Sequence, residues 1–79
     1  MLNMTAVEFM SLKLAKRYEM TERMSADEHD ELSEILIKEA RSIPNKMDKM
    51  RIKMIDASTS ALGNAIALRQ SGKSCLADF

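Results

Sequence analysis

The sequence predicts an all-α protein in which a short N-terminal helix precedes an antiparallel hairpin with a long third helix, assembled as a homo-oligomer. Apolar residues recur at intervals of three and four, and no segment shows the sustained alternation typical of strands. The 79 residues include two glycines and one proline, and Pro44 falls between two helical patterns. We expect one domain over residues 1–72 and a flexible tail over residues 73–79.

The first helix is expected over residues 6–20. Thr5 and Glu8 have the spacing of a capping box, in which each side chain accepts a hydrogen bond from the other residue's backbone amide. The expected apolar stripe consists of Val7, Met10, Leu14 and Tyr18. We expect Arg17 on the opposite, solvent-facing side with the neighbouring lysines.

The second helix is expected over residues 26–43. Ser25 and Glu28 form a second capping box, and acidic residues in the first turns complement the helix dipole. Pro44 disfavours helical geometry at Ile43 and ends the helix. The apolar stripe consists of Leu32, Ile35, Leu36, Ala40 and Ile43. We interpret His29, which has acidic neighbours, as a solvated surface residue.

The third helix is expected over residues 46–70, with Asn45 as its N-cap and Ser71–Gly72 as its stop signal. Its apolar residues fall on two stripes, one of Met47, Met50, Met54, Ala57, Ala61 and Leu68 and the other of Ile52, Ile55, Leu62 and Ile66. The second helix covers only one stripe. The other is left for the first helix or a neighbouring chain, and in so short a chain we favour self-association.

The predicted oligomer or partner interface lies on the third helix. It comprises Met47, Met50, Met54, Ala57, Ala61, Leu62, Asn64, Ile66 and Leu68. Gly63 costs about 1 kcal/mol relative to alanine within a helix, which a closely approaching partner backbone would explain. Alternatively, glycine at position 63 is simply tolerated and has no packing role. Asn64 either sets the register of association or faces water.

Twelve basic and twelve acidic residues balance, so no net charge draws the protein to nucleic acid, and sequence-specific nucleic-acid binding is not expected. The charges are nevertheless segregated, with a basic hairpin tip and an acidic opposite end. Candidate anion-binding residues are Lys38, Arg41, Lys46, Lys49, Arg51 and Tyr18. The alternative is that these charges are ordinary solvated residues that complement the helix dipoles.

Residues for catalysis are scarce. The chain has one histidine and one cysteine, Cys75, and lacks the spacings typical of metal sites, phosphate loops or activated nucleophiles. We therefore expect no enzyme activity, cofactor or metal. The single cysteine, the N-terminus without signal-peptide features and the absence of a run of about 18 apolar residues indicate a cytoplasmic protein without membrane association.

Two segments, IPNKMDKM at residues 43–50 and GNAIALR at residues 63–69, resemble the phage anti-CBASS sponges that sequester cyclic oligonucleotides. The resemblance covers about half of the chain. Leu62 and Gly63 precede Asn64 where that family leads us to expect a tryptophan, and no ligand-contacting residue is carried over. The resemblance implies an oligomer that captures an anionic ligand.

These observations predict a small regulatory or inhibitory protein, like the antirepressors and host-takeover factors of phages and mobile elements. It would act by binding another protein through a Met-rich helical surface. Two alternatives stay open: an oligomeric sponge that sequesters a small anionic ligand such as a cyclic nucleotide, and a structural assembly adaptor.

Overall fold

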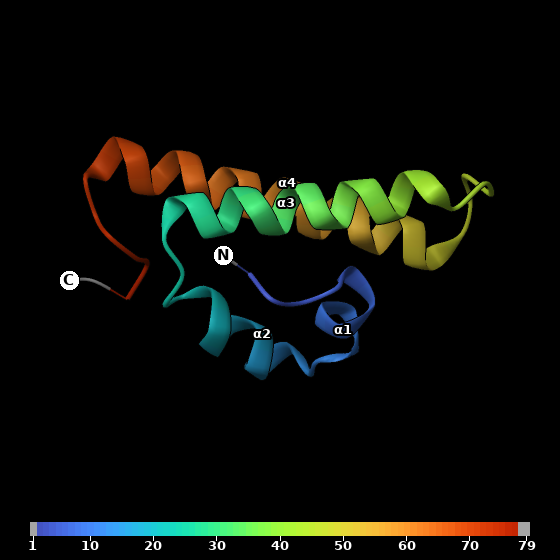
Figure 1. The fold of residues 1–79 in the computed structure, drawn as a ribbon, viewed down its shortest axis with the longest axis horizontal. Coiled ribbons are helices and arrows are strands. Elements are labelled where there is room, and N and C mark those ends of the chain that lie inside the picture. Colours follow the sequence, from blue (N-terminus) through green and yellow to red (C-terminus); the bar gives the residue numbers. More distant parts are fainter. Residues whose placement is uncertain (1, 78–79) are drawn as a thin grey trace.

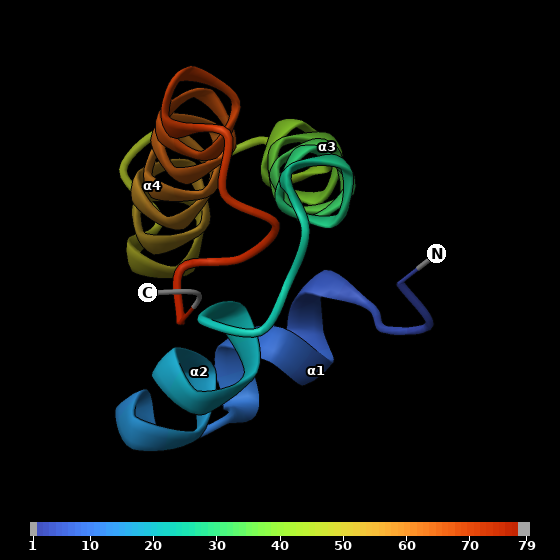
Figure 2. The same ribbon diagram turned by 90° about the vertical axis from the view of Figure 1, so that its left-hand side faces the viewer.

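The computed structural model describes residues 2–77. These residues form four helices and no strand, which confirms the all-α prediction: α1 at Ala6–Ser11, α2 at Leu14–Thr21, α3 at Ala26–Ser42 and α4 at Lys49–Ser71. The helices form two layers, with α3 and α4 antiparallel in one layer and α1 and α2 beneath them (Figures 1 and 2). No helix within residues 2–77 combines the length and apolarity needed to cross a bilayer.

Both predicted capping boxes are confirmed. At α1, the Thr5 hydroxyl accepts from the Glu8 amide and the Glu8 carboxylate accepts from the Thr5 amide, both at 3.1 Å. At α3, the reciprocal bonds between Ser25 and Glu28 measure 3.1 and 3.2 Å. Each box satisfies two backbone donors that the first helical turn leaves without a partner.

The predicted helix over residues 6–20 is interrupted, because Leu12 and Lys13 adopt extended backbone conformations. The interruption leaves carbonyl groups at the end of α1 without intrahelical partners. Arg17 satisfies two of them, donating from its Nη2 to the Met10 carbonyl at 2.7 Å and from its Nε to the Leu12 carbonyl at 3.1 Å. The prediction that Arg17 faces solvent is therefore wrong, since its half-buried side chain bridges the two short helices.

The break also changes which side of the first helix is buried. Val7, Leu14 and Tyr18 of the predicted stripe are exposed, whereas Ala6 and Phe9 are buried. No residue of α2 is buried. The predicted stripe assumes one continuous helix, and its phase is lost once the chain turns between α1 and α2.

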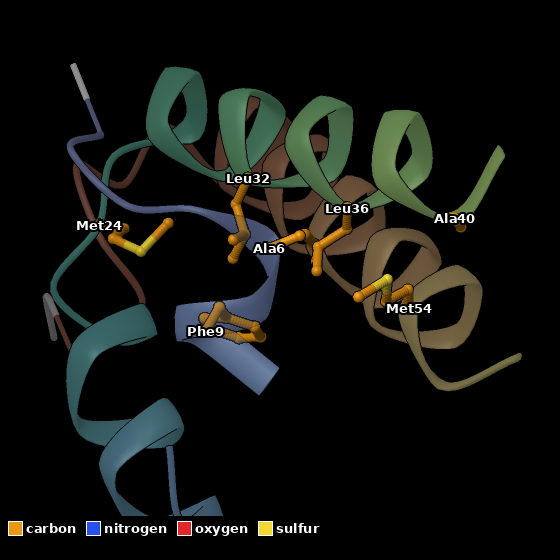
Figure 3. Packing of buried hydrophobic residues seen from close by; sticks show 8 residues of the cluster. Ala6, Phe9, Met24, Leu32, Leu36, Ala40 and Met54 are labelled. Atoms are coloured by element: carbon orange, nitrogen blue, oxygen red, sulfur yellow. The ribbon is translucent and has the colours of Figure 1, made fainter. Parts of the chain in front are cut away.

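The core lies where α1 meets α3 and α4 (Figure 3). Its buried members come from α1, α3, α4 and the segment between α2 and α3: Ala6, Phe9, Met24, Leu32, Leu36, Ala40, Met54 and Ala61. Leu32, Leu36 and Ala40 confirm the predicted stripe of the second helix. Ile35 and Ile43, from the same stripe, are partly buried against the core.

The long helix begins later than predicted, because Asp48 and not Asn45 is its N-cap. The Asp48 carboxylate accepts from the amides of Met50 and Arg51 at 2.9 and 3.3 Å. Asn45 instead closes the preceding turn by accepting from the Met47 amide at 3.0 Å. At the other end, Gly72 adopts a left-handed conformation with φ of 70°, which confirms the predicted stop signal.

The C-terminal segment turns back from the end of α4 toward α2 (Figure 2). The Ala77 amide donates to the carbonyl of Glu22, the C-cap of α2, at 2.9 Å. Within the predicted flexible tail, residues 73–77 are thus connected to the end of α2 by this backbone hydrogen bond. Residues 78 and 79 of that tail lie outside the described residues.

Candidate functional site

A groove of about 790 Å³ lies between α2 and α4. Its floor and walls are formed by Phe9, Met10, Leu14, Arg17, Tyr18, Thr21, Glu22, His29, Leu32, Lys53, Asp56, Ala57, Ser60, Ala61, Asn64, Leu76 and Ala77. Small residues of α4 recur every three or four positions along one wall, and the C-terminal segment contributes Leu76 and Ala77. The volume and the predominantly apolar lining are those of small-molecule sites in proteins.

His29 lines this groove, and its side chain is fully buried. Neither ring nitrogen has a hydrogen-bond partner among residues 2–77. Burial lowers the pKa of His29 below its ordinary value of about 6.5, because the charged form is desolvated. The Thr21 carbonyl and the carboxylates of Glu28 and Asp30 act in the opposite direction. The interpretation of His29 as a solvated surface residue is therefore wrong.

Several polar groups on the walls of the groove lack partners as well. Tyr18 lies on the α2 wall, and Ser60 and Asn64 lie on the α4 wall. No hydrogen bond within residues 2–77 involves the side chains of these three residues. The charged lining residues balance in sign, with Arg17 and Lys53 against Glu22 and Asp56. The groove thus combines an apolar floor, available hydrogen-bonding groups and zero net charge.

A second feature lies on α4 away from the groove. Ile52, Ile55, Thr59, Leu62 and Ile66 follow one another at intervals of three and four, which places them on one helix face. We call this face the outer stripe. Ile52, Leu62 and Ile66 are 43% to 48% exposed, and Ile55 is partly buried against the core. A different face of α4, about 120° around the helix from the outer stripe, includes Met54, Ser58 and Ala61 and is buried.

The structure divides the predicted interface residues among different surroundings. Met54, Ala61 and Leu68 are buried within the chain, so their assignment to an intermolecular interface is wrong. Ala57 and Asn64 line the groove, whereas Leu62 and Ile66 lie on the outer stripe. Met47 precedes α4 and Met50 lies in its first turn, where they are 78% and 42% exposed.

The candidate anion-binding residues do not form one set. Lys38 and Arg41 near the end of α3, and Lys46, Lys49 and Arg51 near the start of α4, surround the turn between the two helices. None of these five forms an ion pair within residues 2–77. Tyr18 lies on α2 and lines the groove, apart from these five basic residues. The Asp48 carboxylate also occupies amides at the start of α4 that an anion would use.

The acidic end of the fold includes Asp27, Asp30 and Glu34 of α3. Arg69 of α4 bonds to Asp30 at 2.6 Å and to Asp27 at 2.9 Å. Among residues 2–77 no cluster of three or more histidine, cysteine or carboxylate side chains forms a metal site.

No family model, curated protein or solved structure matches this chain.

Proposed function

We propose that the protein is a non-enzymatic regulatory or inhibitory interaction protein that self-associates through the outer stripe of α4 and binds a protein partner. The observation that carries the proposal is the exposure of Ile52, Leu62 and Ile66 on a helix that already buries a different apolar face within the chain. One chain leaves this second apolar face uncovered. Contiguous exposed apolar faces of this kind mark interaction sites.

The spacing of the outer stripe suits pairing with a second copy in antiparallel orientation. Thr59 lies at its centre, with Ile55 and Leu62 on either side and Ile52 and Ile66 seven residues away in each direction. A two-fold axis at Thr59 would place Ile52 against Ile66 of the partner subunit. The same residues would then form the interface on both chains, as a symmetric dimer requires.

Charge complementarity supports the same orientation. The acidic end contains Glu34 together with Asp27 and Asp30, which share a single cation, Arg69, whereas the turn between α3 and α4 is surrounded by cations that include Arg41 and Arg51. Antiparallel pairing brings the acidic end of one chain near the basic tip of the other. Parallel pairing would juxtapose like charges, which is unfavourable.

Gly63 offers a further argument for close approach on this side of α4. A Cβ at this position would have no neighbouring atom within 4 Å, so packing within the chain does not require glycine. Glycine in a helix interior nevertheless costs about 1 kcal/mol relative to alanine. A neighbouring backbone packed close to Gly63 would account for it.

The protein-binding part of the proposal rests on Met47 and Met50. These exposed methionines lie at the tip, outside the antiparallel pairing of the outer stripes. Flexible thioether side chains adapt to partner surfaces of varied shape. A symmetric dimer would present one such pair at each end.

Sedimentation velocity tests the self-association. We expect wild-type protein at micromolar concentration to sediment with twice the chain mass of 8.9 kDa. Leu62→Glu, which places a charge on the outer stripe, should return it to a single chain mass. Val7→Glu is the control, because Val7 is also an exposed apolar residue but lies on α1. A single chain mass for wild type, or an equal effect of both variants, would contradict the proposal.

A second candidate function is capture of a small anion at the basic tip, and the finding that its five cations form no ion pair within residues 2–77 favours it. A thermal-shift panel of nucleotides tests this candidate. Stabilisation by a nucleotide that disappears in the Lys46→Ala/Lys49→Ala variant would support it, whereas a flat panel would exclude it.

A further inference from the structure

Unlike the outer stripe, the groove between α2 and α4 contains a buried polar side chain. His29 is fully buried at the groove, and within residues 2–77 neither ring nitrogen forms a hydrogen bond, although the Thr21 backbone carbonyl lies near enough to raise the pKa of the ring. A buried polar group without a hydrogen bond costs roughly its full desolvation energy, so such groups are rare in folded proteins. A ligand edge that displaces the atoms covering His29 would supply the missing partner.

The lining also points to the shape of the ligand. The chain contains three aromatic residues, and two of them, Phe9 and Tyr18, line this groove. The Tyr18 ring is largely exposed, which leaves its face available for stacking. The Phe9 ring already carries the Arg17 guanidinium at 5.6 Å from its centroid. A flat aromatic body suits the free Tyr18 ring better than a flexible aliphatic chain does.

The hydrogen-bonding groups on the α4 wall of the groove narrow the chemical class of the ligand further. The Asn64 side chain presents a donor and an acceptor side by side, and Ser60, four residues earlier, adds a hydroxyl. An amide of this kind can pair with a heterocycle that also offers a donor and an acceptor on one edge. The four charged lining residues cancel, so the groove has no excess positive charge to hold an anion.

We propose that this groove binds a neutral, flat heteroaromatic molecule with a hydrogen-bonding edge, of which a purine nucleoside is the representative probe. The ring stacks on Tyr18, its edge pairs with Asn64, and a second polar group reaches His29. Leu76 and Ala77 close one side of the site, where the Ala77 amide ties the C-terminal segment to Glu22.

Isothermal titration calorimetry of the full chain with adenosine, guanosine and inosine tests the proposal. We expect saturable binding of at least one nucleoside. Asn64→Leu should weaken that binding by about tenfold or more, because loss of a buried hydrogen bond has an effect of this order. Gln70→Leu is the matched control, since Gln70 is an amide on the same helix that does not line the groove. It should bind like wild type.

His29→Phe provides a second test that does not depend on Asn64. It keeps a ring but removes both nitrogens, so it should weaken binding while leaving the fold intact by circular dichroism. If Asn64→Leu fails to fold, Ser60→Ala replaces it, because Ser60 is exposed.

Three results would overturn the proposal: no binding of any nucleoside, unchanged binding in both Asn64→Leu and His29→Phe, or tighter binding of the matching nucleoside monophosphate or of dodecanoate. The monophosphate result would mean that charge drives recognition, and the dodecanoate result that the groove takes an aliphatic chain. None of these results bears on the sedimentation experiment, so the two proposals fail independently.

Discussion

The hydroxyl oxygens of Ser33 and Ser58 lie 2.9 Å apart in the buried contact between α3 and α4. The Ser58 hydroxyl also donates to the Ser33 carbonyl at 2.9 Å. Because Ser58 has one hydroxyl hydrogen and uses it on that carbonyl, the Ser33 hydroxyl must be the donor in the contact between the two side chains. The pair therefore satisfies both hydroxyls without water.

The two single variants, Ser58→Ala and Ser33→Ala, should lower the free energy of unfolding by different amounts. Ser58→Ala leaves the buried Ser33 hydroxyl without a partner and should lower the free energy of unfolding by roughly 1–3 kcal/mol. Ser33→Ala should cost less, since Ser58 keeps its bond to the Ser33 carbonyl. The double variant should be more stable than Ser58→Ala alone, because no orphaned hydroxyl remains. Urea unfolding of the three variants checks the order, and additive effects would contradict it.

His29 should make the fold sensitive to mild acid. Its pKa is lowered in the folded protein, so below about pH 6.5 the unfolded chain binds more protons than the folded one. Stability should therefore be full above that pH and fall as the pH drops toward the lowered pKa. Carboxylates titrate mainly at lower pH. Urea unfolding measured between neutral pH and pH 5 should show this slope in wild type but not in His29→Phe, and equal slopes would exclude His29 as the cause.

The two glycines should respond oppositely to alanine. Gly63→Ala should raise the free energy of unfolding of a single chain by about 0.5–1 kcal/mol, since the added methyl meets no atom and the helix gains propensity. It should also weaken self-association if a partner backbone packs there. Gly72→Ala should be destabilising, because φ of 70° strains residues that carry a Cβ. Unfolding at concentrations below those of association separates the two effects.

Arg17 should contribute far more to stability than its neighbour Lys16. Arg17→Gln removes two hydrogen bonds from a charged donor to the carbonyls at the break between α1 and α2, and should cost roughly 1.5–3 kcal/mol. Lys16→Gln removes an exposed contact of 3.7 Å with Glu19 and should change stability by less than about 0.5 kcal/mol. Thermal unfolding compares them, and equal shifts would argue against a bridging role for Arg17.

The features that the sequence predicts correctly depend on residues close together in the chain. Both capping boxes join residues three apart, and the Gly72 stop depends on one backbone angle. The break at Leu12 has no glycine or proline to mark it. It is stabilised by Arg17 reaching back to carbonyls five and seven residues earlier, which helical periodicity does not reveal.

The groove is less predictable than the helices. His29 does lie at helical spacing from Leu32, Leu36 and Ala40, so its position indicates burial while its polarity and acidic neighbours favour the surface. The helical position of His29 determines its burial despite its polarity, because the α3 face that packs on the core is continuous. Tyr18 of α2 and Asn64 of α4 line the same groove, which no local sequence pattern indicates. By contrast, the two apolar stripes of the third helix are visible in the sequence, and the structure leaves Ile52, Leu62 and Ile66 of the second stripe exposed.

The most direct test of antiparallel pairing is cross-linking of a cysteine at its centre. In a Cys75→Ser background, Thr59→Cys places one thiol at the proposed two-fold axis, where it should meet the same thiol of a second chain. We expect oxidation to give a covalent dimer of Thr59→Cys rapidly, and little from Ala67→Cys, an exposed position on α4 outside the outer stripe. No dimer from Thr59→Cys, or equal yields from both positions, would contradict the proposal.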